Sequence, residues 1–310
     1  MGEINVKPEG DHLVRATALN GQVRLAAVRS SDTVRRARDI HDLSPLSAAA
    51  LGRFRTGLQL MAADLKNKDD QITGIIRSDG PLKGMTAVAS ADRTVRGFVL
   101  RPDLPDYRNA KGKFDLARAV GNGVLTVIKA QAGARPYSGS VPLISGEIAE
   151  DLTYYLATSE QIPTIMGLGV LCDPEGVRHA GGYLIQTLPG AGEDVLDYLE
   201  KRAAGFPDLT FLLNEGFSPA QILDLFAGDP AIQYLATEKT AYGCPCSRER
   251  MAAALMTLSP EDLAELEADE NGAELCCDFC RSRYHFSSAE LSEMAAAARR
   301  SRSGNEENEG

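Results

Sequence analysis

Long apolar runs are missing from this 310-residue chain, which also contains no tryptophan and only four histidines. No uninterrupted apolar stretch approaches the roughly 20 residues of a membrane-spanning helix. The N-terminal segment MGEINVKPEGDHLVRATALN lacks the basic start and apolar core of a secretory signal. We therefore expect a cytoplasmic protein with no membrane partner.

Positive charge is also scarce. Lys and Arg number 33 against 43 Asp and Glu, which gives a formal net charge of -10. Segment 244–310 has seven Arg, no Lys and fourteen Asp or Glu, so it contributes -7 of that total. Because duplex binding draws most of its affinity from Lys and Arg at phosphates, we expect no nucleic-acid partner.

Catalytic signatures are missing as well. The sequence has no GxxxxGK[ST] phosphate loop, no GxSxG elbow, no HExxH motif and no GxGxxG fingerprint. Gly167-Leu168-Gly169 lacks the third glycine and falls in an apolar run, which indicates strand packing. We expect no enzymatic activity and no catalytic residue.

Mixed helix and strand patterns fill residues 1–190. Ser44 and Pro45 precede an Ala- and Leu-rich stretch reaching about Lys66, which predicts a capped helix, and a second helix is expected near 146–159. Three β-rich runs at 71–77, 82–89 and 94–100 predict an antiparallel meander. Further strands are expected at 22–28, 124–129, 138–143, 164–171 and 177–186. Because the strands are grouped, the pattern favours an α+β domain.

Residues 191–243 are predicted to form a helical linker region. Helices are expected at 193–203, at 208–214 and from Ser218-Pro219 to Gly228. Four of the nine phenylalanines fall here: Phe206, Phe211, Phe217 and Phe226. Helices this apolar either form a permanently buried layer or, when undocked, expose a surface that binds other proteins.

Two close thiol pairs follow. Cys244-Pro245-Cys246 is separated by 30 residues from Cys277-Asp278-Phe279-Cys280. This spacing suits a tetrahedral zinc site and equally suits two short-range disulfides. In a reducing cytosol clustered thiols favour metal, so we expect one Zn²⁺ per chain in a small module at 244–300, followed by a polar, frayed tail at 301–310.

Metal binding is expected to decide whether this module folds. Residues 244–300 contain three aromatic rings, Phe279, Tyr284 and Phe286, which is little for an independent core. Structural zinc contributes on the order of 10 to 16 kcal/mol, comparable to the stability of a whole domain. Peroxide attack on the thiolates would therefore unfold the module; the alternative is a structural zinc knuckle that never opens.

Three other potential ligands are predicted to be outside the site. Cys276 adjoins Cys277, and two adjacent residues do not fit easily into one tetrahedral loop. Cys172 lies in an apolar strand and is expected to be a small core residue. His285 is unnecessary where four thiolates are available.

Several segments resemble the heat-shock protein 33 family. They are GNGVLTVIK at 121–129, YSGSVPLISGEIAEDLTYYLATSEQ at 137–161, GLGVLCDPEGVRHAGGYLIQTLPGA at 167–191, and the C-terminal CPCSRER with its distant CDFC. The likeness covers nearly the whole chain. It implies an ATP-independent holdase chaperone of the bacterial cytosol that is activated by oxidative stress, often with heat.

The resemblance also implies roles for particular residues. Cys244, Cys246, Cys277 and Cys280 would bind zinc in the reduced, inactive protein. Oxidation would join the neighbours within each pair, release the metal, unfold the module and loosen the linker. The activated form would dimerise and bind unfolding clients, with the four linker phenylalanines as candidate contacts. The family pattern leaves open whether Cys276 or Cys172 takes part.

Two functions from other classes remain. A thiol-disulfide oxidoreductase would use Cys277 and Cys280 catalytically, although no βαβ frame surrounds the pair. A static adaptor would keep its structural zinc under mild peroxide.

Overall fold

The computed structural model describes residues 9–173, 175–269 and 271–306. The chain divides into two compact units, Met1–Gly243 and Cys244–Gly310. Residues 307–310 of the predicted polar tail lie outside the described residues. Within the described residues, no helix is both long and apolar enough to cross a bilayer.

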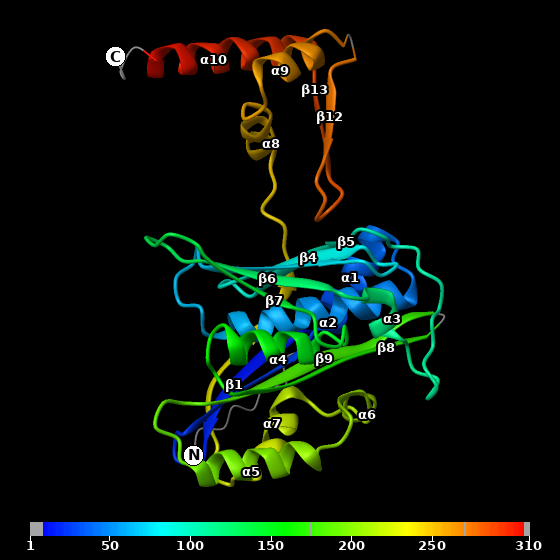
Figure 1. The fold of residues 1–310 in the computed structure, drawn as a ribbon, viewed down its shortest axis with the longest axis vertical. Coiled ribbons are helices and arrows are strands. Elements are labelled where there is room, and N and C mark those ends of the chain that lie inside the picture. The colour runs from blue at the N-terminus through cyan, green and yellow to red at the C-terminus, as the bar shows by residue number, and fades with distance from the viewer. Residues whose placement is uncertain (1–8, 174, 270, 307–310) are drawn as a thin grey trace. The chain divides into compact units, whose positions relative to one another are not determined.

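Two β-sheets form the frame of the first unit (Figure 1). The strands are β1 His12–Ala18, β2 Val23–Arg29, β3 Gln71–Ser78, β4 Gly84–Ser90, β5 Thr94–Val99, β6 Gly123–Ala130, β7 Tyr137–Pro142, β8 Thr164–Asp173, β9 Gly176–Thr187, β10 Gln233–Lys239 and β11 Ala241–Tyr242. One sheet has the order β10-β1-β2-β9-β8 and the other β11-β5-β4-β3-β6-β7. The predicted meander is confirmed, because β3, β4 and β5 pair antiparallel in sequence.

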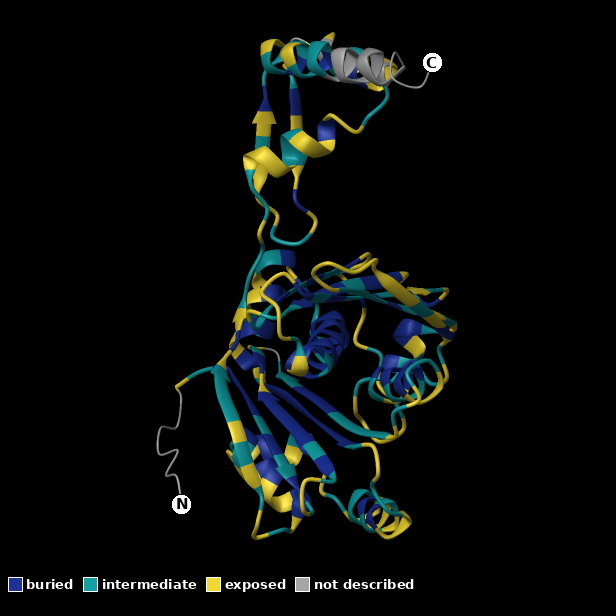
Figure 2. Ribbon diagram, turned by 90° about the vertical axis from the view of Figure 1, so that its left-hand side faces the viewer, coloured by how far each residue is buried: buried dark blue, intermediate teal, exposed yellow. Residues whose placement is uncertain are grey.

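Helix α2, Pro45–Met61, lies between the two sheets and is almost wholly buried (Figure 2). Its predicted start is confirmed: Ser44 Oγ accepts a hydrogen bond from the Ser47 N–H at 3.3 Å, and Pro45 occupies the first turn. The helix ends at Met61, short of Lys66, and a 3-10 turn follows. A helix that is buried on all sides requires apolar layers on both sides.

Besides α2, the described part of this unit before the linker contains the shorter helices α1 Ser31–His41, α3 Leu116–Val120 and α4 Ala149–Thr158. Helix α4 confirms the prediction at 146–159, with a later start. Helix α1 and strand β1 were not predicted. Gly57 shows how closely α4 approaches α2, since a Cβ added there would lie 2.3 Å from Leu152 Cδ1.

A buried cation lies on α2. Arg55 is 1% exposed, and its guanidinium donates to the carbonyl oxygens of Thr33 at 2.8 Å and Val95 at 3.3 Å. The guanidinium also lies 5.2 Å from the ring centroid of Tyr242 in β11. Burial lowers the pKa of Arg55 to about 10, which leaves it charged at neutral pH. The central helix is thereby joined to β5 and to the last strand of the unit.

The linker helices are α5 Glu193–Ala204, α6 Leu209–Asn214 and α7 Pro219–Ala227, and they pack on the five-stranded sheet (Figure 1). The predicted limits of α7 are confirmed by a capping box between Ser218 and Gln221 and by Gly228 at φ 56°. The prediction of a helical linker throughout 191–243 is wrong beyond Gly228. Strand β10 pairs with β1 and β11 with β5, and these partners are supplied by distant segments.

The second unit contains α8 Arg248–Leu255, α9 Pro260–Glu267, the hairpin β12 Ala273–Cys276 and β13 Arg283–Phe286, and α10 Ser288–Glu306. The predicted frayed tail is wrong for residues 301–306, which continue α10. A small buried cluster is present: Leu255, Leu263, Ala273, Phe286, Leu291 and Ala295. A cluster of one aromatic ring and five aliphatic side chains is a limited core, as the sequence predicts for the small C-terminal module. The two units together confirm the predicted α+β fold with a small C-terminal module.

Burial of α2 predicts a stability difference. Leu51 is fully buried between the sheets, whereas Leu235 on β10 is 58% exposed. We expect Leu51→Ala to lower the free energy of unfolding by about 2 to 5 kcal/mol and Leu235→Ala by less than about 0.5 kcal/mol. Urea titrations of the two variants measure this, and equal losses would contradict the packing described.

Candidate metal centre and linker surface

Four sulfur atoms meet in the second unit. The Sγ atoms of Cys244, Cys246, Cys277 and Cys280 all lie within 4.8 Å of one another. The Cys244 and Cys277 sulfurs are 3.7 Å apart, and those of Cys246 and Cys280 are 3.2 Å apart. These two contacts join the CxC segment to the CxxC segment across 30 residues of chain. The structure thus brings together all four predicted ligands.

The β12–β13 hairpin positions one pair of thiols. Its turn is closed by a hydrogen bond from the Cys277 N–H to the Ser282 carbonyl at 2.9 Å and another from the Arg281 N–H to the Cys277 carbonyl at 2.8 Å. Arg281 adopts φ 59°, a left-handed conformation that reverses the chain within the turn. Cys277 is 6% exposed, so its sulfur faces inward.

The other pair lies in the loop between β11 and α8. Ser247 follows directly and caps α8, because its Oγ accepts a hydrogen bond from the Arg250 N–H at 3.3 Å. The helix start therefore limits the position of Cys246. Pro245 restricts the backbone between the two cysteines through its fixed φ.

Neighbouring hydroxyls contact the sulfurs. The Tyr284 hydroxyl donates to Cys246 Sγ at 3.2 Å, and Ser282 Oγ lies 3.2 Å from Cys280 Sγ. Burial raises the pKa of the Cys244 thiol. Burial also acts to raise the pKa of Cys280, but hydrogen bonding with Ser282 and the adjacent sulfurs lowers it to about 7. Apart from their proximity to CxxC, no sequence signal pointed to Tyr284 or Ser282.

The donor set fits a soft tetrahedral metal ion. Zinc bound by four thiolates at about 2.3 Å implies sulfur–sulfur separations of about 3.8 Å. The 3.7 Å and 3.2 Å contacts and the 4.8 Å upper limit are close to that spacing. The four cysteines are therefore able to hold one metal ion, which when bound cross-links the CxC loop to the hairpin.

The three residues predicted to be outside the site are indeed elsewhere. Cys276 is exposed on β12, and its sulfur is not in the cluster of four. Cys172 lies in β8 against the core, where burial raises the pKa of its thiol to about 11 and so makes it a weak nucleophile. The His285 ring contacts the Asn271 carbonyl at 2.7 Å.

The four linker phenylalanines occupy different environments. Phe226 is fully buried, and its ring centroid lies 4.9 Å from that of Phe206. Tyr183 of β9 completes this group, with centroids 5.2 Å from Phe206 and 5.6 Å from Phe226. Phe217 is half-buried against the same cluster. Phe211 is 56% exposed and is the one exposed member of the predicted set.

Beneath the linker helices lies an apolar sheet face that the sequence did not predict as a functional surface. Its buried members are Val14, Ala16, Ala18, Val23, Leu25, Ala27, Tyr183 and Ile185. The register explains the grouping: Val14, Ala27 and Tyr183 are direct cross-strand neighbours on β1, β2 and β9. Alternation within β2 was visible in the sequence, but the pairing of β1 was not. This sheet face and the linker side chains together form what we call the linker interface.

Comparison with known proteins identifies the family. The family described as Hsp33 protein matches residues 11–287, which is most of the chain and includes the linker interface and all four clustered cysteines. The chain belongs to the Hsp33 family.

Relatives cover this Hsp33-family chain almost completely. A protein named 33 kDa chaperonin from Ruminiclostridium cellulolyticum is 42% identical over 91% of this chain and 97% of its own length. A protein of the same name from Agathobacter rectalis is 44% identical over 92% of this chain and 99% of its own length. The crystal structure of the 33 kDa chaperonin (heat shock protein 33 homolog) from Thermotoga maritima superposes with a TM-score of 0.84 at 35% identity, covering 92% of this chain and 97% of that one.

Adjacent cysteines provide a matched test of the metal centre. We expect Cys277→Ser to lose most bound metal, because it removes one of four thiolates, whereas Cys276→Ser keeps one ion per chain. Elemental analysis of both variants, purified under reducing conditions and passed through gel filtration, measures this. Equal metal loss in the two proteins would show that Cys276 is a ligand.

Proposed function

We propose that the protein is a redox-regulated, ATP-independent holdase chaperone. The observation that carries this proposal is the meeting of four thiols in one cluster within a weakly packed module, in a chain whose linker covers a large apolar sheet face. Membership in the Hsp33 family and the names of its relatives support the same function. The protein would act in the cytoplasm, by binding rather than by catalysis.

In the reduced state, Cys244, Cys246, Cys277 and Cys280 would hold one Zn²⁺ ion. The sulfur spacing and the soft donor set support zinc over hard cations such as Mg²⁺ or Ca²⁺, which prefer oxygen ligands. The cross-link would stabilise the second unit, in whose described part the buried apolar cluster comprises six residues. The linker helices would remain docked, and the protein would be inactive.

Oxidation would convert the four thiols into two disulfides. One peroxide molecule takes two electrons from a pair of zinc-bound thiolates and two protons from solvent, forming one S–S bond and two water molecules and leaving Zn²⁺ without those ligands. Family resemblance pairs Cys244 with Cys246 and Cys277 with Cys280. Disulfide sulfurs carry no negative charge and no longer act as metal ligands, so the cross-link between the loop and the hairpin would be lost.

Loss of this cross-link would release the linker helices through the segment that connects them to Cys244. Cys244 follows β11 by two residues, and β11 and β10 connect it to α7. Strand β11 has two residues, which makes it a short and weak anchor. Unfolding that spreads through β11 and β10 would remove one end of the segment that holds α5–α7 on the sheet.

The exposed linker interface would then bind unfolding clients. Its aliphatic and aromatic side chains suit the apolar segments that a partly unfolded protein exposes. Phe206, Phe217 and Phe226 would become accessible together with Tyr183, whereas Phe211 is already exposed. Family resemblance supports a homodimer as the active oxidised form.

Two alternatives are less well supported. Cys277–Cys280 occupies a hairpin turn and not a helix N-terminus, which is the common setting of catalytic CxxC thiols in oxidoreductases. Rapid catalytic reduction of insulin would favour the oxidoreductase. Retention of zinc under mild peroxide would favour a static adaptor.

The redox dependence is testable with the unmodified protein. We expect peroxide-treated protein to suppress aggregation of a thermally unfolding client without ATP, and reduced zinc-loaded protein not to. Light scattering reports aggregation, while a chromogenic chelator follows zinc release in the same sample. Equal suppression by both forms, or suppression preceding any zinc release, would refute the switch.

Destabilising the linker interface tests the position of the client surface. Phe226 is fully buried there, so Phe226→Ala is expected to weaken docking by about 3 to 5 kcal/mol and give partial holdase activity in the reduced protein. Phe211→Ala, at an exposed position of the same linker, serves as the matched control and is expected to stay inactive when reduced. Inactivity of both reduced variants, with α5–α7 shown by limited proteolysis to be released in Phe226→Ala, would place the client surface elsewhere.

A further inference from the structure

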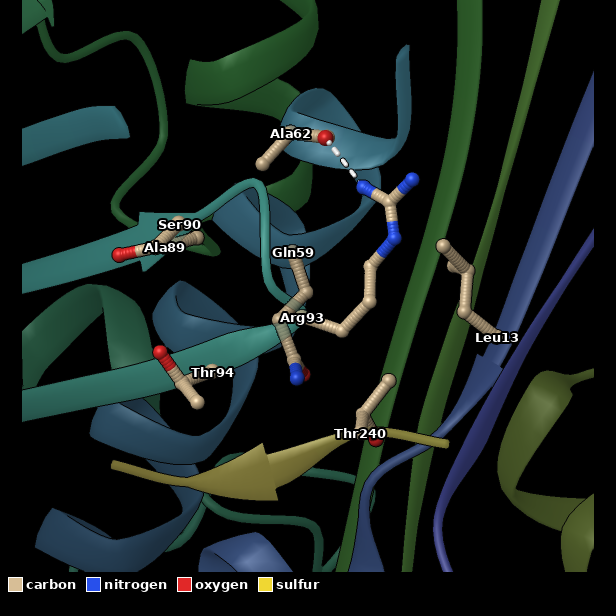
Figure 3. A pocket seen from close by; sticks show the side chains of 8 residues that line it. All are labelled: Leu13, Gln59, Ala62, Ala89, Ser90, Arg93, Thr94 and Thr240. Atoms are coloured by element: carbon tan, nitrogen blue, oxygen red, sulfur yellow. Dashed lines mark hydrogen bonds between the residues drawn. The ribbon is translucent and has the colours of Figure 1, made fainter. Parts of the chain in front are cut away.

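The chain that leads to the clustered cysteines crosses the edge of the six-stranded sheet as β11, which pairs with β5 over two residues. The Ala241 N–H donates to the Arg93 carbonyl and the Gly243 N–H to the Val95 carbonyl, each at 3.3 Å. Thr240, the residue before β11, lines a small cavity together with Arg93 (Figure 3). Two long backbone bonds on a strand of two residues hold this crossing weakly.

Arg55 of the central helix meets the same crossing from the core. Its guanidinium lies 5.2 Å from the ring centroid of Tyr242, within the range of about 6 Å over which a cation is attracted to an aromatic face. It also donates to the Val95 carbonyl at 3.3 Å, the oxygen that accepts the Gly243 N–H. One side chain of α2 therefore contacts both the ring of β11 and the acceptor of the backbone bond that follows it.

Overall stability does not explain an arginine at this position. Arg55 is 1% exposed, and a buried guanidinium loses its hydration. An apolar side chain of similar length would fill the same space without that cost, and such replacements of buried ions are often neutral or stabilising. What an apolar side chain does not supply is a directed attraction for a ring and a carbonyl oxygen. The place of Arg55 between the core and β11 gives that attraction a use.

We propose that Arg55 is the positioning residue that keeps β11 docked, acting chiefly through the ring of Tyr242, and that it thereby keeps the linker on its sheet. Tyr242 lies two residues before Cys244, the first cysteine of the cluster. Unfolding that spreads back from the cluster reaches this contact before it reaches β10 and the linker helices. The role rests on the proposed function, because release of β11 matters only if the linker moves.

Amide hydrogen exchange in the reduced, zinc-loaded full chain tests the contact. We expect Arg55→Met to accelerate exchange at Ala241 and Gly243 about tenfold or more, the effect of losing a desolvated cation–π contact. Arg53→Met is the matched control on the same helix, since its guanidinium pairs with Glu147 at 2.8 Å, and it is expected to leave both amides unchanged. Unchanged exchange in Arg55→Met would overturn the proposal.

A double-mutant cycle separates this role from a general effect on the core. When Tyr242 is already leucine, Arg55→Met is expected to accelerate exchange at Gly243 by less than about twofold, because the shared contact is gone. Tyr242→Phe keeps the ring and is expected to exchange like the parent protein. Equal acceleration by Arg55→Met in the tyrosine and leucine backgrounds would show that Arg55 acts through the core as a whole, which would overturn the proposal.

Linker release provides the last readout. In reduced Arg55→Met with its zinc content verified, we expect faster limited proteolysis within α5–α7 and partial suppression of client aggregation, neither of which Arg53→Met shows. Faster exchange at β11 with the linker helices as protected as in the parent would overturn the role in linker docking. Failure of the oxidised parent protein to suppress aggregation would instead refute the chaperone function, and the exchange and proteolysis results would still decide the role of Arg55.

Discussion

The structure depends on a β-sheet that is apolar on both faces. In β2, Leu25 and Ala27 face the linker helices, while Ala26 and Val28 face α2. Neither face is stable in water, because each exposes a continuous apolar surface across several strands. One face is covered by the central helix α2, and the other by the linker helices α5–α7, which come much later in the chain. The fold thus requires two covers of different kinds.

The two covers differ in how firmly they are held. Helix α2 is enclosed between two sheets and carries Arg55, whose guanidinium bonds to carbonyl groups of α1 and β5. The linker helices contact one sheet face and are connected onward through the short β11. Partial opening of the fold is therefore less costly on the linker side, where fewer buried contacts are lost. If the chain alternates between covered and uncovered states as proposed, the linker helices would be the part that moves.

The cysteine cluster and the linker interface are connected through a few residues that carry polar contacts. Glu238 pairs with Arg93 and Arg15, and Tyr242 lies beneath Arg55. Polar and aromatic side chains in this short stretch contact partners on β1, in the turn before β5, and on α2. These interactions differ from the apolar packing of the linker interface. Polar anchors are directional, which makes them suitable for holding one register of a short strand. They also hold the chain between β10 and Cys244 against the core of the first unit.

The sequence by itself determined several helix boundaries and which four cysteines would cluster. Ser44-Pro45 and Ser218-Pro219 marked helix starts, Gly228 marked a helix end, and the spacing of the four cysteines predicted a common site, because these signals act within a few residues. Only the tertiary structure decided that 233–239 is a strand, since its partner β1 lies more than 200 residues earlier. It likewise decided that Phe211 is exposed while Phe226 is buried, and that Tyr183 packs against Phe226 at the linker interface. Burial and strand pairing depend on which surfaces meet in space, and local sequence carries little of that information.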